Sequence, residues 1–542
     1  MLNKRFSRLI SILLVLLLLV GMTTLTACKP GKTSTSSTSS SISGDTSSET
    51  GSDRSSDEIA STSTGSDTSV DSTTSETGSS TSSSSKTKLT TSSRPVVSNA
   101  PTVPPKKDEV SIPSEVEIEI KPVKDHIIKE TVKNMNGKTF TFATFWEQNY
   151  KASSATPIGD IGEKALKSIQ TDYNCKINLI AMNQDTYLAD INTAKAAGKI
   201  YANIFESHNL STDLISSGIL ADLRTVNSVN LAGQDWNPAF ILSATYKNGI
   251  YGVGVDQNRI LRETIYFNKT IAAKYNLGNF YEMVKKKQWT FDKFLSISQD
   301  VYNKSDKKIY ALNAYHQADF GNFAYANNTS PVVIKSGKVV FNDQDSKLLD
   351  SLNFVQNYTK LGLIDLNFFK QNIYHSGSWP QTVAFANGKS LFFLSFDTNH
   401  QWISPIMTDD FGILPFPIGP HDDNYKSILS DTDYFGLFNQ DPDIEDAGVI
   451  LTAISARTYI KISDWDKNTA KTLRDTDTID MLHLIMNAEL RIRAGGDPFE
   501  GGLKDYNKKA IPQIVRQLQT PRQALDAIAN SVKVQIDSYY GN

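Results

Sequence analysis

Hydrophobic and polar positions follow two different periods beyond residue 137, and together they predict an α/β fold. Short apolar or alternating segments predict strands at 140–146, 176–180 and 202–205. Helical spacing of apolar residues predicts helices between them, at 161–173 and 187–197, the second capped by Gly198. Strands that alternate with helices pair in parallel, and ligands meet the loops at the carboxyl ends of such strands.

A different pattern occupies the N-terminus. Three basic residues precede an apolar run over residues 9–20, which is broken only by Ser11. Such a run is typical of a secretory signal and is shorter than the roughly 20 residues that cross a membrane. The following LTAC at 25–28 resembles the lipobox of bacterial lipoproteins. This resemblance implies a signal peptide over 1–27, acylation of Cys28, and a lipid anchor on the outer face of the cell membrane.

The next segment is rich in Ser, Thr, Gly and acidic residues, and it contains no Phe, Trp or Tyr before Phe140. Such a composition buries too little apolar surface to offset the entropy of ordering. We therefore expect residues 28–136 to be a lipidated cysteine followed by a disordered tether. If Cys28 carries lipid, Cys175 is the one remaining cysteine, and no intramolecular disulfide can form.

The composition of the remaining chain limits its chemistry. All aromatic residues except Phe6 lie between Phe140 and the C-terminus, and an excess of Tyr and Trp often lines ligand sites. The formal net charge is −3, without a basic stripe, and gives no reason to expect a nucleic-acid partner. The histidines do not fall at metal-ligand spacing, and the acidic run at 441–446 favours a helix start over a calcium loop. We expect no metal and no cofactor.

Several segments, in order, resemble extracellular solute-binding proteins of the maltose-binding type (family 1), the capture subunits of ABC importers. They are LISSGILADL at 214–223, IYGVGV at 250–255 followed by IYFNK at 265–269, WTFDKF at 289–294, FANGKSLFFL at 385–394 and FGILPFPIG at 411–419. The resemblance covers residues 140–542. It departs from the family pattern at Gly254, where Pro is usual, and at Leu391 and Phe392, which are bulkier than the usual pair.

The resemblance implies a periplasmic-binding-protein-like fold, with two discontinuous α/β lobes joined by hinge strands and a ligand cleft between them. Within a solute-binding domain at 137–542, lobe one would comprise 137–260 and 420–455, and lobe two 265–412 and 456–542. The implied protein is not an enzyme. As a monomer, it would capture a sugar or oligosaccharide and deliver it to the permease subunits of an ABC transporter.

Candidate ligand-binding residues lie at the predicted strand ends and hinge crossings. Asp256 and Arg259 flank the first crossing, where they would either contact ligand or pair with each other. The other candidates are Trp146 and Glu206 at the ends of two strands, Trp379 in a polar SGSWP loop, Asp397 and Trp402 after a strand at 390–396, and Tyr434 beside the second crossing. In sugar binders of this family, the resemblance places a ring-stacking aromatic near Trp402.

Two other classes of function fit the same sequence. A surface attachment or sensing module on a stalk would use the same fold without transport. A glycoside hydrolase would need two carboxylates about 5–10 Å apart across one sugar bond. Within the binding class, the ligand could also be a peptide or another solute.

Overall fold

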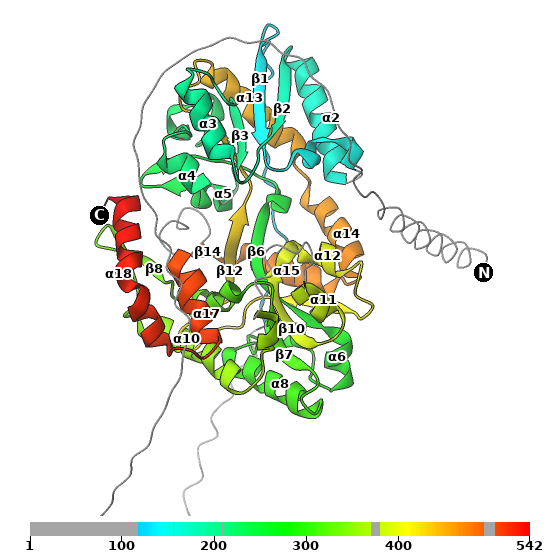
Figure 1. Ribbon diagram of the computed structural model, residues 1–542. Coiled ribbons are helices and arrows are strands. Elements are labelled where there is room, and N and C mark those ends of the chain that lie inside the picture. The colour runs from blue at the N-terminus through cyan, green and yellow to red at the C-terminus, as the bar shows by residue number, and fades with distance from the viewer. Residues whose placement is uncertain (1–116, 155–156, 208–210, 370–379, 493–503, 542) are drawn as a thin grey trace, which may run out of the picture. The chain divides into compact units, whose positions relative to one another are not determined.

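The computed structural model describes residues 117–154, 157–207, 211–369, 380–492 and 504–541. Their helices and strands form two lobes, each with a sheet between helices (Figure 1). This arrangement confirms the predicted two-lobe α/β fold.

Lobe one is built on a four-stranded sheet in the order β13-β3-β1-β2. Its strands are β1 (Thr139–Thr144), β2 (Lys176–Ala181), β3 (Ile204–Ser207) and β13 (Tyr434–Leu437). As predicted, β1 pairs in parallel with both β2 and β3, with Phe142 opposite Leu179 and Ile204. The late strand β13 joins antiparallel to β3.

Helices cover both faces of this sheet because successive side chains of a strand point to opposite sides. Phe142 packs in a core with Ile169 of α2 and Ile450 of α13, whereas Ala143 packs in a separate core with Ile191 of α3 and Phe240 of α5. The helices of lobe one are α2 (Pro157–Asp172), α3 (Tyr187–Ala196), α4 (Ser211–Ser216), α5 (Pro238–Ser243) and α13 (Ile444–Thr458). A two-stranded hairpin, β4 (Thr245–Tyr246) with β5 (Gly249–Ile250), follows α5.

Lobe two is built on a six-stranded sheet in the order β14-β12-β6-β10-β7, with β11 also paired to β6. Its strands are β6 (Ile260–Asn268), β7 (Tyr310–Ala314), β10 (Ser390–Phe396), β11 (Phe411–Leu414), β12 (Lys426–Thr432) and β14 (Glu489–Ile492). The central pair β6–β10 is antiparallel, and β10–β7 is parallel. A separate hairpin joins β8 (Val332–Lys335) to β9 (Lys338–Phe341).

The faces of this sheet are also covered by two sets of helices (Figure 1). Phe392 lies in a large core with Trp289 and with α8, α10, α17 and α18, while Phe393 lies in a smaller core with α11, α12, α14 and α15. The helices are α6 (Lys269–Lys274), α7 (Phe280–Lys285), α8 (Phe291–Lys304), α9 (Phe323–Ala326), α10 (Ser346–Lys360), α11 (Pro380–Ala386), α12 (His400–Ile403), α14 (Ile462–Leu473), α15 (Asp477–Asn487), α17 (Ile511–Val515) and α18 (Pro521–Tyr540).

Three described segments after β1 pass between the two lobes. A short 3-10 turn, Gln257–Arg259, leads into β6; β12 runs directly into β13; and the chain passes from α13 to α14 at 459–461. The strand β12 pairs with β6, so residues 426–432 belong to the sheet of lobe two. The sequence pattern predicted them in lobe one, as part of 420–455, because pairing between strands so far apart in the sequence leaves no mark in the local pattern. The other lobe boundaries stay predictions.

The structure also corrects the C-terminal limit of the tether. Residues 117–136 form no helix or strand, yet they lie against the body, with Ile128 and Met135 buried in the core of lobe one and Ile118 and Ile120 packed on that of lobe two. Apolar residues alternate with polar ones in this segment, which is the pattern of a half-buried extended chain. The prediction relied on the absence of aromatic residues and was wrong for 117–136.

Candidate functional site

Buried charged side chains are concentrated where β6 leaves lobe one and enters lobe two. Glu206, Asp256, Arg259, Arg262 and Asp397 are each at most 5% exposed. Charged groups lose hydration when they are buried, so each needs a partner. The partners divide these residues into two arginine–carboxylate pairs and one separate carboxylate.

The first pair lies on the lobe-one side and joins Arg259 to Glu206. The guanidinium of Arg259 forms an ion pair with the Glu206 carboxylate, and a second nitrogen donates to the Tyr150 hydroxyl at 2.9 Å. The guanidinium also lies over the rings of Tyr150 and Phe435, 5.7 and 5.0 Å from their centroids. Glu206 accepts a further hydrogen bond from the Thr144 hydroxyl at 2.5 Å. This pair is therefore held from several sides.

Asp256 is the separate carboxylate, and it does not pair with Arg259 as the sequence analysis had allowed. Its carboxylate caps the turn Gln257–Arg259 by accepting from the Asn258 backbone N–H at 3.0 Å and from the Asn258 side chain at 2.9 Å. Burial raises the pKa of Asp256 to about 6, and these two hydrogen bonds offset part of the shift. The turn directs Arg259 back toward Glu206 instead.

The second pair lies on the lobe-two side and joins Arg262 to Asp397. The Asp397 carboxylate accepts from the backbone N–H of Arg262 at 3.1 Å, but its contact with the guanidinium is long, at 3.5 Å. Arg262 donates at 2.7 Å to the side-chain oxygen of Gln257, which links it to the hinge turn. Burial raises the pKa of Asp397 to about 6, while Arg262 acts in the opposite direction.

The loop after β10 is fixed by one tyrosine. The Tyr266 hydroxyl donates to the backbone oxygens of Phe396 and Asp397 at 2.7 and 3.0 Å, and it accepts from the His400 N–H at 2.9 Å. This arrangement positions Asp397 and starts α12, which carries Trp402. Trp402 is 67% exposed, so its ring is available to a ligand.

An aromatic group at the same edge of lobe two was missed by the sequence analysis. Tyr315 and His316 follow β7, and Phe396 ends the parallel neighbour β10. The Tyr315 ring centroid lies 4.3 Å from that of His316 and 5.2 Å from that of Phe396, and all three residues are half-buried. Carboxyl ends of parallel strands are where ligands bind in α/β sheets. The apolar segment YALNA at 310–314 was the available signal.

The remaining predicted residues fall in different environments. Trp146 is half-buried at the start of a 3-10 turn after β1. Tyr434 is fully buried, and a Cβ added at Gly252 would lie 2.1 Å from its ring. Its ring packs in a core of lobe one, and its contact with ligand stays a prediction. Trp379 and Cys28 lie outside the described residues.

The described part of the chain contains neither a candidate metal site nor a candidate membrane span. No group of three or more His, Cys, Asp or Glu side chains in it could hold a metal ion. None of its helices has the length and apolar character needed to span a membrane.

Comparisons with known proteins identify the family. A family model described as bacterial extracellular solute-binding protein matches residues 164–454. No curated protein matches the chain.

Solved structures agree with the fold. A binding protein of Arthrobacter globiformis for cyclic α-maltosyl-1,6-maltose has a TM-score of 0.54 at 12% identity, covering 74% of this chain and 99% of its own. A substrate-binding protein of Listeria monocytogenes in complex with cycloalternan has a TM-score of 0.52 at 12% identity, covering 75% and 99%. The maltose-bound MalE3 protein of T. maritima has a TM-score of 0.50 at 16% identity, covering 73% and 100%. Because the family model spans more than half of the sequence, this chain belongs to the bacterial extracellular solute-binding proteins, which capture a solute outside the cell.

Proposed function

We propose that this protein captures a sugar or oligosaccharide and delivers it to the permease subunits of an ABC transporter. One observation carries the choice of a sugar: both lobes present aromatic side chains beside polar ones at the carboxyl ends of their strands. Trp146 lies there in lobe one, and Tyr315, His316, Phe396 and Trp402 lie there in lobe two. Sugar rings offer apolar faces for such rings and hydroxyls for buried polar groups. The solved neighbours named for maltose-type ligands support the same class.

The two hinge pairs favour binding over catalysis. A glycosidase needs one protonated and one ionised carboxyl group that are free to act on the sugar. Glu206 forms an ion pair with Arg259, and Asp397 accepts from the Arg262 backbone N–H and lies 3.5 Å from its guanidinium, so both carboxylates already have partners within the protein. Trp146, Glu206, Asp256, Arg259, Asp397 and Trp402 remain the proposed surroundings of the ligand, with Tyr315 and His316 added.

A thermal-shift screen of the full chain against maltose, larger maltose-type oligosaccharides, monosaccharides and short peptides tests the substrate class. A ligand at 100 times its dissociation constant stabilises the folded state by about 2.7 kcal/mol. We expect a rise in Tm with at least one sugar and none with peptides, and unchanged sugar by chromatography after long incubation. A shift with peptides alone would contradict the sugar assignment, and sugar cleavage would point to the hydrolase.

The proposed lipid anchor at Cys28 is tested separately. The lipobox-like LTAC at 25–28 and the short apolar run before it support this proposal. Cys28→Ser should release the protein into the medium or leave the signal uncut. A variant that stays on the membrane with a normally cut N-terminus would contradict the anchor.

A further inference from the structure

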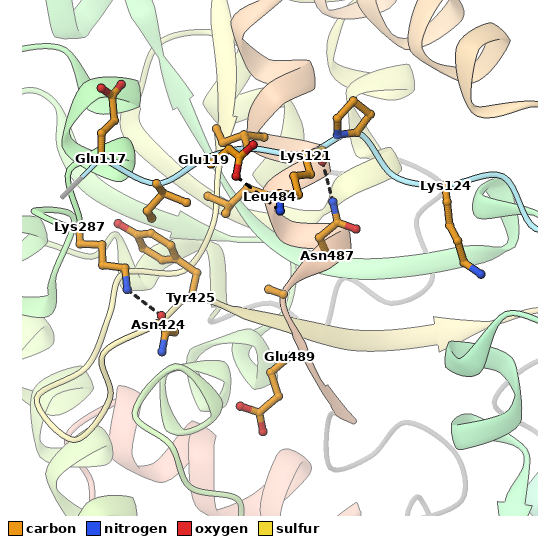
Figure 2. A pocket seen from close by; sticks show the side chains of 14 residues that line it. Glu117, Glu119, Lys121, Lys124, Lys287, Asn424, Tyr425, Leu484, Asn487 and Glu489 are labelled. Carbon is orange, nitrogen blue, oxygen red and sulfur yellow. Dashed lines mark hydrogen bonds and ion pairs between the residues drawn. The ribbon is translucent and has the colours of Figure 1, made fainter.

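Residues 117–130, which we call the strap, connect the two lobes along an extended path. On lobe two, the Ile118 N–H donates to the backbone oxygen of Lys285 in α7 at 2.8 Å. The strap then meets α15, where Asn487 donates to the backbone oxygen of Lys121 at 2.7 Å and the Val123 N–H donates to Nδ1 of His483 at 2.9 Å. Figure 2 shows the strap passing over α15.

The strap reaches lobe one within a few residues. Lys124 forms an ion pair with Asp235 at 2.9 Å, and Lys129 exchanges hydrogen bonds with the Gln234 side chain at 2.9 and 2.6 Å. Glu130 accepts from Nε of Arg457 at 2.9 Å. Ile128 is 8% exposed, within the core of lobe one.

Between these anchors the strap has little slack. Val123 is held by His483 of lobe two, and three residues later Nδ1 of His126 lies 3.2 Å from the backbone oxygen of Asp235 in lobe one. Between them, the carboxylate of Asp125 accepts from the Ile462 N–H at 2.8 Å and from the Tyr459 hydroxyl, at the passage from α13 to α14. Three extended residues span about 10 Å. A rotation of the lobes that separates these anchors must therefore break one of them.

The lobe-two anchor is the weaker of the two. Ile118 and Ile120 are only half-buried, and both line an open cavity of about 840 Å³. Tyr425 and Leu484 line the same cavity (Figure 2). The lobe-one end has Ile128 in the core and the Glu130–Arg457 pair, and Met135, shortly after the strap, lies in the same core. Burial of apolar side chains holds a segment more firmly than single hydrogen bonds near solvent.

We propose that the strap is a restraint on the hinge, and that its lobe-two end, from Glu117 to Val123, detaches when the lobes rotate. Because the Ser/Thr-rich segment lies N-terminal to the strap in the sequence, tension on the chain from that side would reach Ile118 first. The inference concerns lobe motion and does not depend on which solute is bound.

Spin labels test the restraint in the full chain without ligand. The exposed residues Asn192 in α3 and Lys293 in α8 are replaced by labelled cysteines in a Cys28→Ser background; Cys175 is buried. Ile118→Ser/Ile120→Ser should broaden the inter-lobe distance distribution. Glu117→Ser/Glu119→Ser, which alters exposed residues of the same segment, should not. If the inter-lobe distance has the same mean and width in the isoleucine variant as in the protein with the unaltered strap, the proposal is overturned.

Amide hydrogen exchange tests the order of detachment without any substitution in the strap. The amides of Ile118 and Val123 should exchange at least tenfold faster than that of Met135, which donates to the backbone oxygen of Tyr173 at 2.7 Å. Slower or equal exchange at Ile118 would show that the lobe-two end does not detach first. If the double serine variant fails to fold, Asn487→Ala at an exposed position removes one anchor and takes its place in the distance measurement.

Discussion

Two buried arginine–carboxylate pairs flank the hinge, and they are built differently. Arg259 and Glu206 are surrounded by Thr144, by the Tyr150 hydroxyl and by two aromatic rings. Arg262 and Asp397 share a guanidinium–carboxylate contact of 3.5 Å, and Arg262 makes a shorter bond to Gln257 at 2.7 Å.

The difference indicates two roles. Buried charges contribute to a stable fold only when their geometry and remaining hydrogen bonds compensate for lost hydration. The Arg259–Glu206 pair has two such bonds, to Tyr150 and from Thr144, although Nε of Arg259 has none among the described residues, and it would anchor the hinge turn to lobe one. The Arg262–Asp397 pair is less well compensated, because its guanidinium–carboxylate contact is 3.5 Å long, so its groups can exchange partners with a ligand at lower cost. The experiments that follow separate these roles.

The largest effect is expected at the lobe-one pair. Glu206→Gln leaves the buried Arg259 charge without its counter-ion, and breaking a buried ion pair destabilises by about 3–5 kcal/mol. Denaturant unfolding should show this loss. The double variant Glu206→Gln/Arg259→Met removes both charges and should recover part of it. A loss below about 1 kcal/mol in the single variant would mean that this pair is no better compensated than a surface pair.

The ionised carboxylate of Asp397 should lower the stability of the fold, whereas that of Glu206 raises it, and the effect of Asp397 should depend on pH. Its folded pKa of about 6 lies above the unfolded value of about 4, so the folded state holds the proton more tightly. The free energy of unfolding therefore falls as pH rises from about 4 to 6. Above about pH 6 the loss reaches its maximum of about 3 kcal/mol. Relative to Asp397→Asn, the unaltered protein should gain stability as pH falls from 7 to 5.

Asp222 provides the control for this titration. Its hydrogen bonds to Arg224 lower the pKa of its carboxyl group, so it stabilises the fold above the unfolded pKa and loses that contribution as pH falls. The stability difference caused by Asp222→Asn should therefore shrink toward acid, in the opposite direction to that for Asp397. A pH-independent difference for Asp397→Asn would contradict the proposed contrast between the hinge pairs.

Local pattern predicted much of the fold. The strand at 390–396 coincides with β10, and the helix before Gly198 ends there because this glycine has a φ of 67°. The pattern did not show that β12 pairs with β6, since pairing depends on residues more than 150 positions apart. Strand β7 was not predicted, so Tyr315 and His316 were missed.

The sequence predicted where candidate residues lie on the strands but not their partners. Glu206 lies near the end of β3 and Asp397 directly after β10, as the strand pattern predicted, and their contact with ligand stays a prediction. Arg259 pairs with Glu206 and not with Asp256 because of the turn Gln257–Arg259. The sequence does not specify the geometry of this turn. The contact of the strap with the body was not predicted, because the segment has no aromatic residues. The alternation of isoleucine with glutamate at 117–120 was the available signal.

A smaller effect is expected at Trp402, beside the lobe-two pair. Because its side chain is 67% exposed, Trp402→Ala should cost much less than the 3–5 kcal/mol of a core Trp deletion. If a sugar ring stacks on it, affinity should fall about ten- to a hundredfold, equivalent to about 1.4–2.8 kcal/mol. Calorimetry with the sugar identified by the thermal-shift screen measures this. Unchanged affinity would remove Trp402 from the proposed site and weaken the assignment of ligand contact to the lobe-two side.

The smallest effect is expected at an exposed ion pair, which shows whether burial or pairing determines the large loss at Glu206. Lys467 and Asp464 in α14 are 3.3 Å apart, with side chains 69% and 58% exposed. Solvent screens such pairs, and their measured contributions are about 0.2–1 kcal/mol. Lys467→Met should therefore change the free energy of unfolding by less than about 0.5 kcal/mol, and the change should disappear in high salt. If Lys467→Met lowered the free energy of unfolding as much as Glu206→Gln, an exposed pair would contribute as much as a buried one. Burial and surroundings could then not distinguish the two hinge pairs.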